Sequence, residues 1–338
     1  MTTIADVART AGVSISTVSY VMSGKRTISQ DTRERVEQAI AELNYSPHSS
    51  ARSLASRSTQ VLGLQAPLRS GVDVHVVMEI VAGVVREARE HQYDILLLTS
   101  DDAAGLARAA RSKTVDALLV MDVESHDPRI ASLEALSTPS VLIGLPDGAE
   151  KLTCVDFDFE AAGRLAASRL AELGHTRVAL IGAPEEVLER HTSYADRLMR
   201  GFLTACDELG LEGTVHPCPS SAEASAVVDE VLSVRPEVTG VLFHNEGALP
   251  HVAAQLMDAS CDVIALCPLD VARTVPGLTD VIDIPAEEIG ATATRAAMAV
   301  LGGDAHERAH LIAPRLASAG ASAGASAGAS AGASAAEA

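Results

Sequence analysis

The chain has 338 residues, 47% of them apolar, which is enough for a small domain beside a larger one with a buried core. No apolar run approaches the ~20 residues of a membrane-spanning helix, and residues 1–10 lack the basic and apolar segments of a secretory signal. We therefore expect a cytoplasmic protein. The five cysteines form no CxxC pair, which argues against a disulfide framework and against zinc: Cys154, Cys206, Cys218, Cys261 and Cys267.

The net charge of −19 is divided unevenly along the chain. Residues 1–60 contain seven Lys or Arg and five Asp or Glu, a charge of +2, whereas the rest contains 19 and 40, a charge of −21. Because an acidic surface repels nucleic-acid phosphates, any binding to DNA should be confined to the first 60 residues.

The first segment predicts a helix-turn-helix. Gly12 would supply the tight turn, because glycine adopts positive φ without strain, and Ser14 suits the N-cap of a second helix. Val18 would fill the space between the two helices. The same spacing also occurs in ordinary helical hairpins, so the pattern alone leaves both possibilities open. The residues that would share the buried face of the first helix are Ile4, Val7, Ala8 and Ala11.

A third helix is predicted after Ser29, which would cap it, with Asp31 in the first turn where the helix dipole favours an acidic residue. The following segment, residues 47–58, is polar and basic apart from Leu54. As a free segment it should be mostly disordered. Leu54 could make only a weak surface contact, or it could insert as an apolar wedge into a DNA minor groove.

Three groups of residues carry a resemblance to a known family, nearly continuous over residues 2–64. They are Thr3-Ile4-x-Asp6-Val7-Ala8 with Ala11-Gly12-Val13-Ser14-x-x-Thr17-Val18-Ser19, then Ser29-x-x-Thr32-Arg33-x-x-Val36, and Tyr45-x-Pro47-x-x-x-Ala51-Arg52-Ser53-Leu54. Together they resemble the lactose/galactose-repressor (LacI/GalR) family, in which a small helical head binds DNA.

The resemblance implies that the second helix lies in the major groove, with Ile15 and Ser16 reading bases and Leu54 entering the minor groove from a hinge helix. Tyr20 stands where the family commonly has an arginine able to pair with guanine. Base reading should therefore favour thymine methyl groups. The residues expected at the DNA, including those that hold phosphates, are Ile4, Ser14, Ile15, Ser16, Thr17, Ser19, Tyr20, Ser23, Thr27, Ser29, Thr32, Tyr45, His48, Ala51, Arg52 and Leu54.

Beyond residue 60, short apolar runs alternate with amphipathic segments, which predicts parallel sheets covered by helices. The expected strands are Val61–Leu64, Ile95–Leu98, Ala117–Met121, Ser140–Ile143, Val178–Ile181, Gly240–Phe243, Val263–Leu266 and Val281–Ile284. The expected helices include Val76–His91, Phe159–Leu173, Leu198–Leu209, Ala222–Leu232, Ala248–Met257 and Pro285–Leu301. The pattern alone is compatible with one large sheet or with two lobes.

The stretch from Asp156 to Gly182, with Leu173-Gly174-His175-x-Arg177-Val178 at its centre, also resembles the repressor family and implies an α/β domain of two lobes, like a periplasmic binding protein. The expected domains are a helix-turn-helix head (1–47), a hinge helix and linker (48–59), an effector-binding and dimerisation domain (60–316) and a low-complexity disordered tail (317–338). Lobe 1 would take about 60–157 and 285–302, and lobe 2 about 158–283 and 303–316, with a last strand near Leu311–Pro314.

Motifs of nucleotide-dependent enzymes are missing, because neither GxGxxG nor GxxxxGK[ST] occurs in the chain. GxSxG matches, at residues 320–324 and twice more up to residue 332, all lie in the Ala-Ser-Ala-Gly repeat and lack the strand-turn-helix context of a nucleophile. We expect no enzymatic activity, no cofactor and no metal.

In open α/β sheets, ligands bind beyond the carboxyl ends of the strands. Polar residues there would suit a hydroxyl-rich ligand, although each one alone could be a solvated loop residue. The residues expected to contact an effector are Asp73, His75, Asp122, Tyr194, Arg197, Asn245 and Glu246, with Glu124, Arg190, His191 and His244 as further candidates.

Three departures from the family pattern put an ordinary sugar pocket in doubt. Arg197 is one residue further from Gly201 than the family's effector arginine, and Asn245-Glu246 replaces Asn-Asp. Residues 265–268 replace the usual Gly-Phe-Asp-Asp, so no carboxylate is in register there. The effector could be a sugar or another small molecule, or the cleft could be degenerate.

The expected function is that of a dimeric, nucleoid-associated repressor of a palindromic operator, regulated by a small-molecule effector between the lobes. The alternative is an activator or global regulator with the same head and a degenerate or non-sugar cleft. The apolar face of Val76–Arg89 is a candidate dimer interface, although a core stripe would explain it equally well. No leucine heptad follows the body, so a coiled-coil tetramer is not indicated.

Overall fold

The computed structural model describes residues 2–23, 26–45, 58–66, 69, 72, 74–304 and 307–318, and of Ser23 only the backbone. The expected hinge helix and the repeat that ends the chain therefore lie outside the described residues, and so do five expected contact residues: His48, Ala51, Arg52, Leu54 and Asp73. Among the described helices, none is long and apolar enough to cross a membrane.

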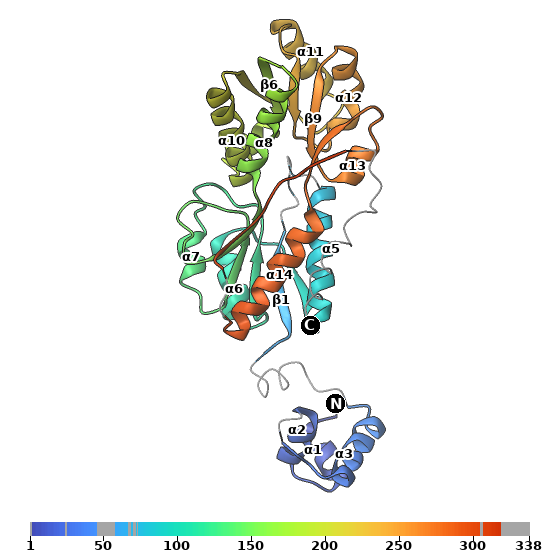
Figure 1. Cartoon of the computed structure of the whole chain (residues 1–338). Helices are drawn as coiled ribbons and strands as arrows, with labels where there is room; N and C mark the ends of the chain where they lie inside the picture. The colour runs from blue at the N-terminus through green and yellow to red at the C-terminus, as the bar shows by residue number, and fades with distance from the viewer. Residues whose placement is uncertain are drawn as a thin grey trace, which may run out of the picture.

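The first segment forms a three-helix bundle: α1 (Ile4–Ala11), α2 (Ile15–Ser23) and α3 (Gln30–Glu42), drawn in blue in Figure 1. Thr3 and Asp6 form a capping box at the start of α1, and Gly12 ends that helix with φ +65°, as the turn prediction requires. The Ser14 hydroxyl accepts a hydrogen bond from the Thr17 N–H (3.1 Å), so it caps α2 as expected.

The bundle is held by three valines that are fully buried, one from each helix: Val7, Val18 and Val36. Ser29 occupies the N-cap position of α3 but makes no capping hydrogen bond there. Its hydroxyl instead donates to Thr32 Oγ1 (2.9 Å), which corrects the prediction that it caps the helix. Two adjacent hydroxyls satisfy each other at this helix start.

Lobe 1 is built on a parallel sheet in the order β11-β5-β4-β3-β1-β2 (Figure 1). Its strands are β1 (Val61–Gln65), β2 (Asp94–Leu98), β3 (Ala117–Val120), β4 (Ser140–Ile143), β5 (Thr153–Phe157) and β11 (Ala309–Ile312). Its helices are α5 (Val74–Glu90), α6 (Ala103–Arg111), α7 (Ile130–Glu134) and α14 (Ala286–Gly302).

Lobe 2 has a sheet in the order β12-β10-β9-β8-β6-β7, parallel except for β12. Its strands are β6 (Arg177–Gly182), β7 (Glu212–Pro217), β8 (Gly240–Phe243), β9 (Asp262–Cys267), β10 (Asp280–Asp283) and β12 (Leu316–Ser318). Its helices are α8 (Phe159–Glu172), α9 (Glu185–Glu189), α10 (Ser193–Leu209), α11 (Ala224–Val234), α12 (Leu249–Asp258) and α13 (Leu269–Arg273).

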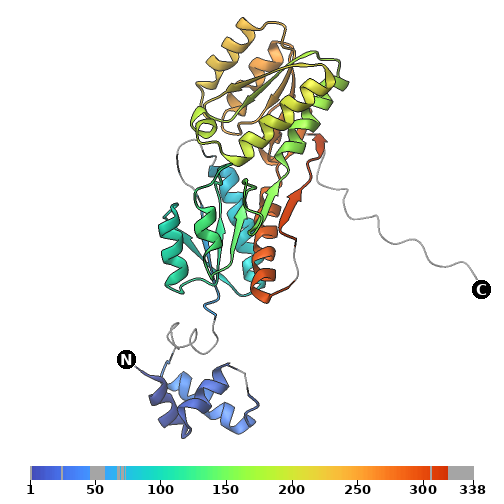
Figure 2. The ribbon, with the colours of Figure 1, turned by 90° about the vertical axis from the view of Figure 1, so that its left-hand side faces the viewer.

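The chain passes between the lobes three times, after β5, after β10 and after β11, and Figure 2 shows the third passage as the strands that rise beside both sheets. The prediction that 303–316 belongs to lobe 2 is wrong, because β11 pairs with β5 in lobe 1. α14 carries the chain away from lobe 2, so β11 must first return along the edge of the lobe 1 sheet. The strand that completes lobe 2 is β12, paired antiparallel with β10.

All eight predicted strands are present, but the sequence pattern missed three further strands, β5, β7 and β12, and β12 (Leu316–Ser318) shows that the predicted disordered tail begins too early at 317. β5 is short and contains a threonine and an aspartate, so it lacks a continuous apolar run. β7 is half-buried at the edge of its sheet and contains Gly213 and Pro217, which weaken a strand signal.

Two helices of lobe 1 cross with their backbones in contact. A Cβ atom at Gly83 of α5 would lie 2.0 Å from the Glu287 carbonyl oxygen of α14. A Cβ atom at Gly290 of α14 would lie 2.0 Å from the Ile80 carbonyl oxygen of α5. Only glycine fits at either position.

Lobe 2 repeats this arrangement with α8 and α10. A Cβ atom at Gly201 of α10 would lie 2.0 Å from the Glu160 carbonyl oxygen, and one at Gly163 of α8 would lie 2.4 Å from the Leu198 carbonyl oxygen. Each lobe therefore contains one pair of helices fixed by reciprocal glycine contacts.

Gly201→Ala should lower the free energy of unfolding by about 1–3 kcal/mol, because the backbones of α8 and α10 must separate to admit the methyl group. Gly182→Ala is the matched control, since its added Cβ would lie 3.7 Å from the nearest atom, on Leu180. The midpoint of urea unfolding measures both variants. Equal losses would show that the helix crossing is not the constraint.

Candidate functional site

The outward face of α2 carries large side chains that a small bundle would normally bury. Ile15 is 51% exposed and Tyr20 is 37% exposed. Ser16 is exposed beside Ile15, whereas Val18 and Val21 point into the bundle. The structure thus brings together on one surface three of the residues predicted to read bases.

Hydroxyl groups of predicted DNA-contact residues lie at the starts of α2 and α3. The Ser14 hydroxyl lies 2.8 Å from the hydroxyls of both Ser16 and Thr17. The Ser29–Thr32 pair stands at the start of α3. The amides and hydroxyls of two helix starts are the donors that phosphate contacts use.

The other predicted contact residues of the head differ in exposure. Thr27 is exposed, and Ile4 and Ser19 are half-buried. Tyr45 is buried among the core residues of the bundle, so little of its ring is available to DNA. Its position in the family motif had suggested a contact, but its packing accounts for an aromatic residue there.

Arg26 was not among the predicted residues. Its guanidinium carbon lies 5.5 Å from the centre of the Tyr20 ring, within the range of a cation–π contact. The positive charge of the first 60 residues was the available signal, but it did not single out this arginine. Arg26 places a cation beside the aromatic residue that replaces the family's arginine.

A cavity of about 140 Å³ lies between the two lobes, at the carboxyl ends of their strands. Lobe 1 supplies mainly apolar walls from α5, from the ends of β3 and β4 and from the start of α14, together with Asp122 and Asp156. Lobe 2 supplies Phe159, Ser193, Tyr194, His244 and Glu246. The cavity is therefore apolar, with carboxylates, a hydroxyl and an imidazole at a few points.

Three rings form the lobe 2 side of this cavity. Tyr194 lies 5.3 Å from Phe159 and 5.7 Å from His244, measured between ring centres, and Phe159 lies 5.8 Å from His244. Burial lowers the pKa of His244 to about 4, so the imidazole is neutral near pH 7. Phe159 was not predicted as a site residue, because it reads as an ordinary helix residue.

The Asp122 side chain is buried in lobe 1, and the residue's backbone has φ +52°, which turns the chain after β3. Its carboxylate accepts hydrogen bonds from Arg190 of lobe 2 (2.9 Å) and is paired with Arg69 of lobe 1 (2.6 Å). Arg129 supports this turn by donating to the Asp122 carbonyl (2.9 Å), and Arg129 is itself paired with buried Asp127 (2.6 Å). Asp122 thus joins the two lobes.

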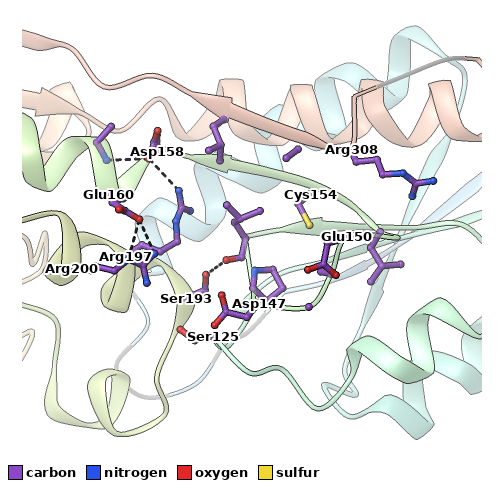
Figure 3. Close-up of a pocket in the computed structure, with 18 of the residues that line it drawn as sticks. Ser125, Asp147, Glu150, Cys154, Asp158, Glu160, Ser193, Arg197, Arg200 and Arg308 are labelled. Carbon is purple, nitrogen blue, oxygen red and sulfur yellow. Dashed lines mark hydrogen bonds and ion pairs between the residues drawn. The ribbon is translucent and has the colours of Figure 1, made fainter.

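Arg197 is buried, and its guanidinium donates to Asp156 at the end of β5 (2.7 Å) and to Asp158 at the start of α8 (3.2 Å). Burial raises the pKa of Asp156 to about 7, against the attraction of this arginine. Arg197 does not line this cavity but a separate groove, together with Asp158 and Arg200 (Figure 3). In this arrangement the N–H groups of Arg197 are bound to Asp156 and Asp158, where the chain passes from lobe 1 to lobe 2.

The predicted pair Asn245-Glu246 is divided by the fold. The Asn245 side-chain amide donates to the Cys218 carbonyl (2.6 Å), and its oxygen accepts from the Ala248 N–H (3.2 Å), which uses its polar atoms within lobe 2. Glu246 lines the cavity, 3.9 Å from His244. An asparagine that stabilises a loop cannot be distinguished from a ligand residue by sequence alone.

The remaining predicted residues lie around the cavity rather than in its wall. His75 is half-exposed on α5, 2.9 Å from Asp270 of lobe 2. Glu124 pairs in an isolated β-bridge with Thr192, and His191 is exposed, 3.4 Å from Asp196. Arg190 reaches the cavity region only through Asp122.

This second, open groove has a volume of about 680 Å³ and is lined by residues of both lobes, among them Asp147, Glu150, Glu160 and Arg200 (Figure 3). Two of its arginines pair with carboxylates: Arg200 with Glu160 (2.7 Å) and Arg197 with Asp158 (3.2 Å). The Ser193 hydroxyl donates to the Leu145 carbonyl across the groove. This last contact joins the lobes on this side too.

The model of the lacI family of bacterial regulatory proteins matches residues 3–48, and that of the periplasmic binding protein-like domain matches residues 167–321. The HTH-type transcriptional regulator RafR of Escherichia coli is 31% identical over 255 residues, which cover 71% of this chain and 72% of RafR. The chain belongs to the LacI family. The HTH-type transcriptional regulator AglR of Rhizobium meliloti (strain 1021) is 36% identical over 205 residues, 59% of this LacI-family chain and 56% of AglR.

The fold of this LacI-family protein is that of solved family structures. The lac repressor dimer bound to operator and the anti-inducer ONPF matches with a TM-score of 0.77 at 22% identity, over 93% of this chain and 97% of that chain. The expected fold class, a helix-turn-helix head with a two-lobed domain of parallel sheets, is confirmed.

His244 should make stability depend on pH. The His244 imidazole has a pKa of about 4 in the folded protein, against about 6.5 in the unfolded chain. Between these two pH values the unfolded chain binds a proton at this residue and the folded protein does not, which favours unfolding. Stability is therefore retained above that range and lost as the pH falls. From about pH 7.5 to about pH 5, wild type should lose about 2 kcal/mol more than His244→Gln in urea unfolding. The same loss in both proteins would contradict a buried neutral imidazole.

Proposed function

We propose that this protein is a sequence-specific transcriptional repressor that binds a palindromic operator as a dimer and responds to a small, sugar-like effector between its lobes. One observation carries the proposal: α2 presents Ile15, Ser16 and Tyr20 outward in a chain whose second part encloses a cavity between two lobes. Membership of the LacI family supports this pairing of a DNA-binding head with a sensor.

The chemistry of α2 indicates which bases it would read. Ile15 is apolar, and Tyr20 can donate one hydrogen bond or pack on a methyl group, so thymine methyls are the favoured contacts. Phosphate contacts would come from the hydroxyls at the helix starts and from Arg26. The charge of −21 outside residues 1–60 keeps DNA away from the lobes.

The dimer would form along α5. Val74, Met78 and Val85 recur at helical spacing and are all exposed, with Met78 51% exposed. Leu96 and Leu97 of β2, the edge strand of the same sheet, are exposed as well. A second copy that packs its own α5 here would bury this stripe, as a two-fold interface requires.

The effector would occupy the cavity that holds Asp122, Tyr194, His244 and Glu246, whose polar atoms can bond hydroxyl groups. The volume of about 140 Å³ is below the ~300 Å³ from which ligand pockets usually start. The lobes must therefore part to admit a ligand. Opening would break the contacts between Asp122 and Arg190 and between Asp156 and Arg197, so ligand binding and lobe angle are coupled.

Residues 58–60, which lead into β1, are held firmly against lobe 1. The Asp116 carboxylate accepts hydrogen bonds from the Thr59 N–H (2.7 Å), the Thr59 hydroxyl (2.8 Å) and the Gln60 N–H (2.9 Å), and another from Ser58. Residues 58–60 must therefore follow any rotation of lobe 1. In a dimer, that rotation would change the spacing of the two heads and hence the affinity for DNA.

The full-length protein should enrich a palindrome from a pool of random DNA, and a mixture of small metabolites, sugars among them, should change the recovery of that sequence. The physical reason is that two identical heads read two half-sites and the effector alters their spacing. A palindrome that is recovered equally with and without the mixture would contradict an effector-regulated repressor. No enrichment at all would contradict sequence-specific binding.

A variant with both Ile15 and Ser16 replaced is the control for base reading. It should select a different sequence while its affinity for non-specific DNA stays nearly unchanged, because the phosphate contacts remain. Selection of the wild-type palindrome would assign base reading to other residues.

Met78→Asp should convert the dimer to a monomer, since it would place a carboxylate in the centre of the α5 stripe. Loss of the second head should weaken operator binding by at least about 100-fold. Leu209→Asp is the matched control, because Leu209 is also exposed (47%) but lies at the end of α10, away from α5. Light scattering gives the oligomeric state of the two variants, and a DNA-binding titration gives their affinity for the operator. A dimeric Met78→Asp protein would exclude α5 as the interface.

A further inference from the structure

A histidine and two carboxylates meet where the lobes touch, outside the cavity. His75 Nε2 lies 2.9 Å from Asp270 Oδ2 and 3.8 Å from Glu79 Oε1. One ligand atom from each of the three residues lies within 4.8 Å of the other two. His75 and Glu79 are one helical turn apart on α5, so both face Asp270.

These donors suit a divalent metal ion of the first transition series. Imidazole nitrogen favours ions such as Zn²⁺ over Mg²⁺, and carboxylate oxygens complete many such sites. Around an ion with bonds of ~2 Å, tetrahedral ligand atoms lie about 3.3 Å apart. The two separations from His75 bracket that value, and the third lies within 4.8 Å, so small side-chain rotations would bring all three atoms to one ion. His75 and Asp270 are about half exposed, which leaves room for a water ligand.

The surroundings of the three residues are strongly negative. Burial raises the pKa of Glu79, and the carboxylates of Asp270, Glu287 and Asp283 raise it further, against the opposite effect of His75. One of them, Glu287, is offset by Arg86 at 2.8 Å. A bound cation would relieve the repulsion that Glu79 and Asp270 exert on each other.

The ligands come from different lobes. α5 belongs to lobe 1, and α13, which carries Asp270, connects two strands of lobe 2; Figure 1 shows α13 above the upper end of α5. We propose that His75, Glu79 and Asp270 bind a divalent first-row transition-metal ion, such as Zn²⁺, that fastens the two lobes together.

The ion would replace the direct hydrogen bond between His75 and Asp270 with two metal–ligand bonds. Because it would bind only when the lobes are close, it stabilises the closed arrangement, and an effector that opens the lobes must work against it. This role is separate from the DNA-binding function proposed above, since it depends on neither the head nor the dimer. The cysteines were the basis for expecting no zinc; all five are buried and do not compete for the ion.

The test is a titration of Zn²⁺ into chelator-treated, full-length protein, followed by calorimetry and by the midpoint of thermal unfolding. Wild type should show one saturable site per chain and a midpoint that rises with Zn²⁺, whereas Mg²⁺ should leave the midpoint unchanged. His75→Gln and Asp270→Asn should each weaken Zn²⁺ binding by at least about tenfold. Both side chains are exposed, so neither variant should unfold the protein.

His126→Gln is the matched control, because His126 is exposed and lies 3.4 Å from a single carboxylate, Asp147. It should bind Zn²⁺ like wild type. Equal binding by wild type and His75→Gln would overturn the proposal, because Zn²⁺ would then sit on other surface histidines. Loss of binding in His75→Gln but not in Asp270→Asn would also overturn it, since the ion would then be held by α5 alone.

Discussion

The architecture of both lobes depends on a steric constraint, the contact of helix backbones at reciprocal glycines. Gly83 and Gly290 fix α5 against α14, and Gly163 and Gly201 fix α8 against α10. These four helices also carry the walls of the interlobe cavity, among them Ile80, Ile289, Phe159 and Tyr194. The constraint therefore holds each half of the cavity as a rigid unit. Any change in cavity shape must come from movement of one lobe against the other.

The contacts between the lobes are of a different kind. Asp122 with Arg190, Asp156 with Arg197 and Ser125 with Asp196 (2.6 Å) are polar pairs that water can replace when the lobes part. Buried charges of this sort contribute little net stability, but they specify one geometry, since a displaced partner leaves an unpaired charge. Rigid apolar lobes joined by exchangeable polar pairs are suited to a domain that opens and closes.

The sequence predicted what depends on neighbours along the chain. The turn at Gly12 and eight strands follow from local periodicity and turn chemistry, and the family resemblance supplied the base-reading residues of α2 and the two lobes. What it missed depends on residues far apart. β7 and β11 are edge strands, and the strand with which each pairs decides the sheet to which it belongs. The Asn245 side chain is hydrogen-bonded to the Cys218 carbonyl, and Arg197 forms an ion pair with Asp156. No local pattern distinguishes such internal partners from ligand contacts.

The third passage between the lobes affects the order in which this protein can be made. Lobe 1 lacks α14 and β11, and lobe 2 lacks β12, until the ribosome has synthesised residues 286–318. The three-helix head, in contrast, is complete after about residue 45. Because domains fold in the order of their synthesis, the head is ready to meet DNA while the sensor is still unfinished. In a newly made chain, the lobes can regulate the head only after β12 has been synthesised.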